Sequence, residues 1–102
     1  MGLVMSRTTE SARGEDCTVR FPAVCSFDPD TTIFAHLSGV RFGHGTGIKT
    51  KLGAYSCGKC HDLIDSRIPR PEGVTKQDVK IAHYEGIFET LIKLDEKGII
   101  KL

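Results

Sequence analysis

Hydrophobic and polar positions divide the chain into a β-prone first part and a helical last third. Residues 32–37 form an apolar, β-prone run, and residues 54–56 form a second, shorter one. Over residues 76–96 apolar side chains recur at helical spacing, which predicts the longest helix of the chain. A small α+β domain is therefore expected.

Capping residues predict where the helices begin and end. Thr75 is the expected N-cap of the long helix, with Asp78 at the capping-box position, and Gly98 ends it. A second helix is expected over residues 58–67. The segment 68–73 contains two prolines, which end that helix.

The remaining segments carry weaker patterns. A short helix capped by Ser6 or Thr8 is expected to end at Gly14. Residues 17–21 alternate and include β-branched side chains, which predicts a short strand. Residues 38–53 contain five glycines, so this segment is expected to form a long hairpin or loop that can approach a ligand closely.

The length of 102 residues allows one domain, and the hydrophobic content of 39% favours an added cross-link. We find no apolar run long enough for a transmembrane helix and no secretory signal. The chain is therefore expected in the cytosol, where clustered cysteines favour a metal over a disulfide.

The four cysteines form the complete ligand set of a structural zinc site: Cys17, Cys25, Cys57 and Cys60. Cys57 and Cys60 have the usual Cys-x-x-Cys spacing, whereas seven residues lie between Cys17 and Cys25. One alternative is a set of small buried side chains, and another is a redox pair. A thioredoxin-like pair needs a βαβ context that this pattern lacks, so structural zinc is the favoured interpretation.

Two of the histidines are candidates for chemistry. His36 ends a predicted strand, a position where a histidine is more often structural than catalytic. His61 and Asp65 are four residues apart on one helix face, and together they suit Mg²⁺, Mn²⁺, Ni²⁺ or Zn²⁺. The alternative for this pair is a solvated polar face. His83 is interpreted as structural and His44 as exposed.

Charge is concentrated in the middle third, although the net charge of the chain is only +1. Between residues 41 and 70, six basic side chains face two acidic ones, Asp62 and Asp65. The basic residues are Arg41, Lys49, Lys51, Lys59, Arg67 and Arg70. Such a surface suits a polyanionic substrate, and the alternative is a solvated loop rich in lysine.

The order of these features resembles a known nuclease architecture. A cysteine pair, a strand-borne histidine, a glycine-rich hairpin and a Cys-x-x-Cys-His sequence follow one another, as in HNH or ββα-metal endonucleases with a four-cysteine structural zinc. The chain is similar above all to the YbcO-like nucleases of lambdoid phages and prophages. Residues 12–25, 35–37, 45–49, 57–65 and 85–86 carry the similarity.

The resemblance implies a role for each candidate residue. His36 matches the general base that activates water, and His61 and Asp65 match the helix-borne ligands of a catalytic divalent cation. That cation stabilises the leaving 3′ oxygen and the charged phosphorane. The basic residues expected to hold the DNA backbone are Arg41, Lys49, Lys51 and Arg67.

Two positions differ from the usual HNH pattern. Ala35 precedes the base, where the pattern has an aspartate or histidine that ligates metal. The chain contains no asparagine, so the middle Asn of the pattern is absent. Backbone carbonyls or water would then have to orient His36.

We therefore predict a single domain over residues 1–102, with a zinc-stapled ββα-metal (His-Me finger) core over 17–67 and a C-terminal helix and tail over 75–102. The predicted activity is hydrolysis of DNA phosphodiester bonds in phage recombination or DNA processing, in the cytoplasm of a bacterial host, with no membrane partner. The alternatives are a non-catalytic zinc-stabilised nucleic-acid-binding module and a zinc-stabilised protein-interaction domain. The sequence leaves open whether the chain forms a homodimer.

Overall fold

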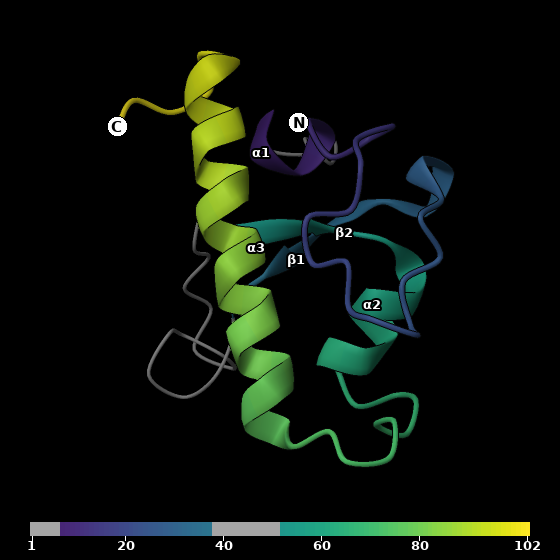
Figure 1. Ribbon diagram of the computed structural model, residues 1–102. Coiled ribbons are helices and arrows are strands. Elements are labelled where there is room, and N and C mark those ends of the chain that lie inside the picture. Colours follow the sequence, from purple (N-terminus) through teal and green to yellow (C-terminus); the bar gives the residue numbers. More distant parts are fainter. Residues whose placement is uncertain (1–6, 38–51) are drawn as a thin grey trace, which may run out of the picture.

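The computed structural model describes residues 7–37 and 52–102, which form a small α+β fold with a β-hairpin followed by helices (Figure 1). In chain order the elements are α1 (Arg7–Glu10), the 3-10 turn η1 (Pro29–Thr31), β1 (Ile33–His36), β2 (Gly53–Ser56), α2 (Gly58–Ile64) and α3 (Lys76–Glu96). The strands predicted over residues 32–37 and 54–56 and the long helix are confirmed. The predictions for Arg41, His44, Lys49 and Lys51 concern residues outside the described ranges.

The two strands pair antiparallel, with His36 opposite Gly53. A Cβ atom at Gly53 would lie 2.5 Å from the Phe34 ring, so any larger residue here would have to displace that buried ring. The pairing extends one step past the strands, because Leu37 N–H donates to the Leu52 carbonyl at 2.9 Å. The end of β1, where His36 lies, is thus fixed from its neighbour strand.

Helix α3 packs chiefly against β2 and lies across the sheet (Figure 1). The predicted apolar stripe divides into two faces: Val79, Ile87 and Leu94 are buried, whereas Tyr84 and Phe88 are exposed. The inner face therefore carries the packing of α3, and the outer face leaves aromatic rings in solvent.

Gly86 marks the closest approach of α3 to the rest of the chain. A Cβ atom there would lie 3.0 Å from Thr18 Oγ1 and 3.2 Å from Ala54 Cβ. Thr18 Oγ1 is within 3.1 Å of Thr90 Oγ1 and donates to the Gly86 carbonyl at 3.0 Å. Buried hydroxyl contacts thus hold α3 against β2 and against the segment that contains Thr18.

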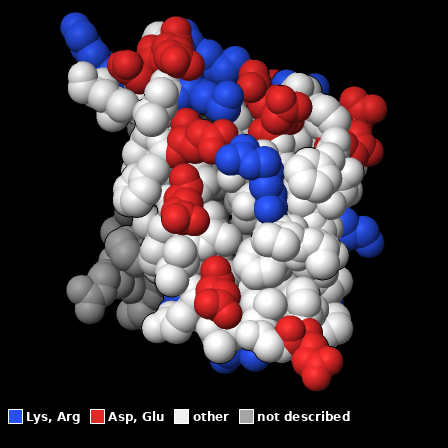
Figure 2. All heavy atoms as spheres, viewed as in Figure 1, with Lys and Arg blue, Asp and Glu red and all other residues white. Residues whose placement is uncertain are grey.

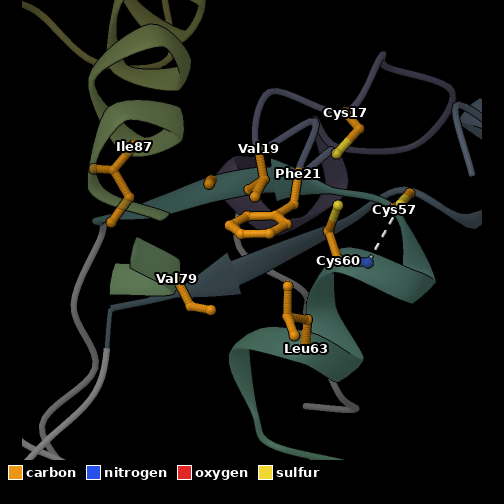
Figure 3. Packing of buried hydrophobic residues seen from close by; sticks show 9 residues of the cluster. Cys17, Val19, Phe21, Cys57, Cys60, Leu63, Val79 and Ile87 are labelled. Atoms are coloured by element: carbon orange, nitrogen blue, oxygen red, sulfur yellow. Dashed lines mark hydrogen bonds between the residues drawn. The ribbon is translucent and has the colours of Figure 1, made fainter. Parts of the chain in front are cut away.

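Two hydrophobic clusters lie toward opposite ends of α3. The first joins the cysteine region to α2 and the first half of α3 (Figure 3): Cys17, Val19, Phe21, Ala54, Cys57, Cys60, Leu63, Val79 and Ile87. The second joins the turn after α1 to the sheet and the end of α3: Ala12, Phe34, Tyr55 and Leu94. The sheet is therefore held from both ends of the long helix.

The predicted caps of α3 are confirmed. Thr75 Oγ1 accepts from Asp78 N–H at 3.1 Å, and Thr75 N–H donates to the Asp78 carboxylate at 2.8 Å. Gly98 has a φ of +74° and ends the helix. Residues 99–102 form no strand, and the N–H groups of Ile99 and Ile100 both donate to the Leu94 carbonyl.

The predicted strand over residues 17–21 is wrong. Arg20 has a φ of +43°, which is incompatible with a strand, and its N–H donates to Cys17 Sγ at 3.3 Å. Thr18 N–H still donates to the Tyr55 carbonyl at 2.7 Å, so the segment touches β2 at one point. The chain turns around the cysteine sulfur instead of extending along the sheet.

Helix α2 ends at Ile64, three residues earlier than expected. Ser66 has a φ of +60°, and Arg67 N–H donates to the Asp62 carbonyl at 2.8 Å. Together with the bond from Ser66 N–H to the Leu63 carbonyl, this is a Schellman ending, which usually has glycine at the left-handed position. Because Ser66 takes the place of the usual glycine, this helix end could not be predicted from the sequence.

Within the described ranges, no helix combines the length and apolar character needed to cross a membrane.

Candidate metal centre and candidate catalytic residues

The four cysteine sulfurs meet in one place, as predicted. Their Sγ atoms all lie within 4.8 Å of one another, and those of Cys25 and Cys57 are 3.8 Å apart. A tetrahedron with metal–sulfur bonds of about 2.3 Å has edges of about 3.8 Å, whereas a disulfide needs about 2.05 Å. Figure 3 shows the sulfurs of Cys17 and Cys60 turned toward one another.

Backbone N–H groups surround these sulfurs. Four of them donate at 3.3 to 3.5 Å: Arg20 to Cys17, Phe27 to Cys25, and both Ser26 and Cys60 to Cys57. Such bonds favour the thiolate, which is the form that ligates a metal. The backbone is therefore arranged for charged sulfur rather than for four neutral thiols.

The pKa values of the cysteines are shifted in opposite directions. A hydrogen bond from the Cys60 thiol is the main cause that lowers the pKa of Cys17, and the same bond raises the pKa of Cys60. Burial raises the pKa of Cys25 to about 11. A divalent cation would remove this conflict by stabilising all the thiolates together. Donor type, number and distances thus suit a structural zinc ion with no open position.

Local sequence explains how the two cysteine pairs come together. Cys57 is itself the N-cap of α2, and its sulfur accepts from the N–H three residues later. Thr31, at the end of η1, accepts from Gly58 N–H at 3.2 Å and ties the first pair's loop to the start of α2. Ala23 and Phe27 have φ values of +66° and +54°. Left-handed backbone at such residues persists where the surroundings impose it.

His61 and Asp65 come together on α2 as expected. His61 Nε2 lies 3.2 Å from Asp65 Oδ2, and both side chains are partly exposed. Two ligands about 2.1 Å from an octahedral cation and at right angles to one another lie about 3.0 Å apart. The pair therefore fits two positions of a divalent cation. Across the described chain, no third His, Cys, Asp or Glu completes a cluster with them like that of the cysteines.

Arg67 lies beside this pair and is engaged with both acids of α2. Its guanidinium donates to Asp65 at 2.9 Å and to Asp62 at 3.1 Å. The predicted contact of Arg67 with DNA backbone would therefore compete with two ion pairs. Figure 2 shows one face of the molecule, where acidic and basic side chains are mixed without a continuous basic area.

His36 lies at the exposed end of β1. Its ring meets the Phe34 ring edge-on, with centroids 4.9 Å apart, which limits its orientation. Phe34 in turn covers Gly53 on the paired strand. The strand that bears the predicted base is thus packed, while its last side chain reaches solvent.

His83 has a place that sequence reasoning did not assign. It is buried on the inner face of α3, and its Nε2 lies 2.9 Å from the carbonyl oxygen of Ala35, the residue before His36. Burial is the main cause that lowers the pKa of His83, and the charges of Asp65 and His61 also act on it. Its position on the same helix face as Val79 and Gly86 was the available signal, since a polar residue there needs a buried partner.

Comparison with known proteins covers nearly the whole chain. Residues 6–99 match the family model described as "Putative nuclease YbcO". Two proteins described in the same words, from Escherichia coli (strain K12) and Enterobacteria phage 82, are each 34% identical over 99 residues, which span 95% of this chain and 99% of theirs. A solved structure described as "Structure of a putative bacteriophage protein from Escherichia coli str. K-12 substr. MG1655" matches with a TM-score of 0.69 at 31% identity, over 88% of this chain and 98% of that chain.

Proposed function

The chain belongs to the YbcO family of nucleases, and on that premise we propose that it is a metal-dependent endonuclease of the ββα-metal type that hydrolyses DNA phosphodiester bonds. One observation carries the proposal. A hairpin whose first strand ends in His36 leads directly into α2, which bears His61 and Asp65 with facing atoms 3.2 Å apart. A strand-borne imidazole and a helix-borne ligand pair are the parts that this chemistry needs.

In this mechanism His36 accepts a proton from the water that attacks the phosphorus atom. An imidazole suits this role because its ordinary pKa lies near neutral pH, so the neutral base is available. The exposure of His36 at the end of β1 allows a DNA backbone to reach it.

His61 and Asp65 would hold the catalytic divalent cation: Mg²⁺, Mn²⁺, Ni²⁺ or Zn²⁺. When bound, that cation supplies positive charge to the leaving 3′ oxygen and to the phosphorane. Asp65 contributes a carboxylate oxygen and His61 a ring nitrogen, both from one turn of α2. The four cysteines serve a different purpose, since they would hold the first turn of α2 against the loop before β1.

The DNA backbone needs cationic partners around this centre. We assign this role to the basic residues already predicted, Arg41, Lys49, Lys51 and Arg67, of which the structure describes Arg67. Its side chain is more than half exposed, so a phosphate can compete with Asp62 and Asp65 for the guanidinium.

A second candidate function is a non-catalytic, zinc-stabilised DNA-binding module. The observation that favours it is the ion pair between Asp65 and Arg67 at 2.9 Å, which satisfies a carboxylate that the nuclease needs for its cation. Ala35, where HNH nucleases usually have another metal ligand, agrees with this candidate.

The test uses supercoiled plasmid and branched DNA with Mg²⁺, Mn²⁺ or Ni²⁺. The wild-type protein should nick at least one of these substrates, and His36→Ala and His61→Ala should each lower the rate by about 100-fold or more. Lys101→Ala, in the exposed tail, is the control and should leave the rate unchanged. Equal nicking by His36→Ala would remove that residue from the mechanism, and DNA retention without cleavage in every metal would favour the binding module.

A further inference from the structure

His83 joins the helix α3 to the strand that carries the predicted base. We propose that His83 is a positioning residue for the cleavage reaction, which fixes the end of β1 and thereby the place of His36 relative to His61 and Asp65. This inference rests on the proposed function. It assigns a role to a side chain that lies outside the predicted catalytic set.

The hydrogen bond that carries the inference is long-range in sequence and short in space. His83 Nε2 and the Ala35 carbonyl oxygen are 48 positions apart in the chain and 2.9 Å apart in the fold. Because α3 packs chiefly against β2, this bond gives α3 a direct connection to β1 as well. It holds the peptide group immediately before His36.

The surroundings of His83 make this bond persistent. The side chain is 5% exposed, so water has little access to replace either partner. Burial lowers the pKa of His83 and so favours the neutral imidazole, and a neutral ring that donates to the Ala35 carbonyl through Nε2 carries its proton there. Tyr84 stacks beside the ring, with centroids 6.4 Å apart. Donor and acceptor are thus held in one arrangement.

The His83 ring is also affected by the predicted cation ligands on α2. The charges of Asp65 and His61 act on His83 in opposite directions, so its ring lies within electrostatic reach of the α2 pair. His83 therefore contacts the base-bearing strand and lies in the electrostatic field of the pair on α2. A packing role alone would need the volume of the ring but not its N–H group.

The test distinguishes the role of the His83 N–H group from the role of the volume of its ring. His83→Leu keeps a buried apolar shape and removes the donor, and His83→Gln retains an N–H donor of similar reach. Thr90→Val is the matched control, because it removes buried hydrogen bonds that α3 makes with Tyr55 N–H of β2 and with the Thr18 hydroxyl. All three are compared in single-turnover cleavage, in DNA affinity and in thermal unfolding.

We expect His83→Leu to lower the single-turnover rate by about tenfold or more with DNA affinity unchanged, since small displacements of a reacting group cost rate rather than binding. His83→Gln should recover most of that rate. Thr90→Val should cleave like the wild type even though its melting temperature falls. Wild-type cleavage by His83→Leu, or a folded His83→Gln that stays as slow as His83→Leu, would overturn the proposal.

A second readout does not depend on activity. The Leu37 N–H, bonded to the Leu52 carbonyl at 2.9 Å, lies one residue past His36 and reports on the end of β1 by hydrogen exchange. Its exchange should be about tenfold faster in His83→Leu and unchanged in Thr90→Val; unchanged exchange in His83→Leu would overturn the proposal. If the wild type cleaves no DNA while the Leu37 effect is present, the proposed function fails and His83 is left with a structural role.

Discussion

The sulfur atoms of Cys25 and Cys57 lie 3.8 Å apart, although 32 positions separate them in the sequence. The contact joins the loop before η1 to the N-cap of α2, across the sheet that lies between them in the chain. A metal ion at this place would cross-link the two halves of the first hydrophobic cluster. Stability and metal content are therefore expected to change together.

Removal of one zinc ligand should unfold the domain. The purified protein should contain about one zinc ion per chain, and Cys57→Ser should lose it together with the cooperative thermal transition. The binding free energy of structural zinc in small zinc domains is about 10–16 kcal/mol. This is comparable with the free energy of unfolding of a whole domain, which is about 5–15 kcal/mol. Metal analysis and circular dichroism measure the two effects.

Ser56→Ala is the control for this prediction, because Ser56 is buried next to Cys57 but donates to a backbone carbonyl rather than to a metal. This variant should retain its zinc. A wild-type protein that is free of metal and still unfolds cooperatively at high temperature would contradict the prediction.

His83 should make the wild-type protein sensitive to mild acid. Its pKa is lowered in the folded state, so protonation below the unfolded value of about 6.5 favours the unfolded chain. The stability is complete above that value and falls as the pH drops toward the folded pKa, by at most about 1.4 kcal/mol per pH unit. A cation bound near His61 and Asp65 would act in the same direction.

Urea denaturation of the wild type and of His83→Leu between pH 5 and 8 measures this effect. All other titrating groups are common to both proteins, so the difference between the two curves isolates His83. The free energy of unfolding of the wild type minus that of His83→Leu should be constant above about pH 7. It should decrease below about pH 6.5, because the wild type loses stability there and His83→Leu lacks this loss. Parallel curves over the whole range would show that His83 does not change its proton affinity on folding.

Gly86→Ala should destabilise the fold although alanine favours helices. The gain in helix propensity is about 1 kcal/mol, whereas overpacking costs about 1–3 kcal/mol. The neighbours have little room to move, because Thr18 Oγ1 is held by contacts to Tyr55 and Thr90 and Ala54 belongs to β2. We expect a net loss of about 1 kcal/mol, or a melting temperature lower by about 4–8 °C.

Lys80→Ala, on the exposed face of α3, is the control for the propensity gain and should leave the melting temperature unchanged or slightly raised. If Gly86→Ala raised the melting temperature as much as Lys80→Ala, the residues that contact α3 at Thr18 and Ala54 would have to make room for the methyl group at no cost in stability.

Arg67→Ala should tighten the binding of the proposed catalytic cation. Arg67 donates to Asp65 at 2.9 Å, so its positive charge competes with a cation for the same carboxylate. The exposure of this ion pair limits the effect to about two- to fivefold in the Mn²⁺ concentration that gives half-maximal cleavage. Arg70→Ala is matched in charge and donates to the Val74 carbonyl instead, so it should not change that concentration. Weaker cation binding in Arg67→Ala would place Asp65 outside the cation site.

Sequence patterns predicted the elements whose signals are local. The run that became β1, the run that became β2 and the caps of α3 each depend on a few neighbouring residues, and the structure confirms them. The meeting of the four cysteines was also predicted, from their number, the Cys-x-x-Cys spacing of one pair and the expected compartment, and the structure confirms it.

The missed features depend on contacts far apart in the chain. The segment of Cys17 looked like a strand because its side chains alternate, but hydrogen bonding to the sulfur puts Arg20 into left-handed backbone. The end of α2 was missed because Ser66 takes the place of the usual glycine. His83 gave no signal of its partner, since nothing in the sequence indicates that Ala35 lies 2.9 Å away.

The hydrogen bond between Leu37 and Leu52 has an evolutionary consequence. It closes the sheet at Leu37 and Leu52, immediately outside residues 38–51, so these two flanking residues are held by the hairpin itself. Mutations in residues 38–51 can therefore change the proposed DNA contacts of Arg41, Lys49 and Lys51 while His36 and α2 keep their places. Divergence within the family can then be faster in residues 38–51 than in the framework around them.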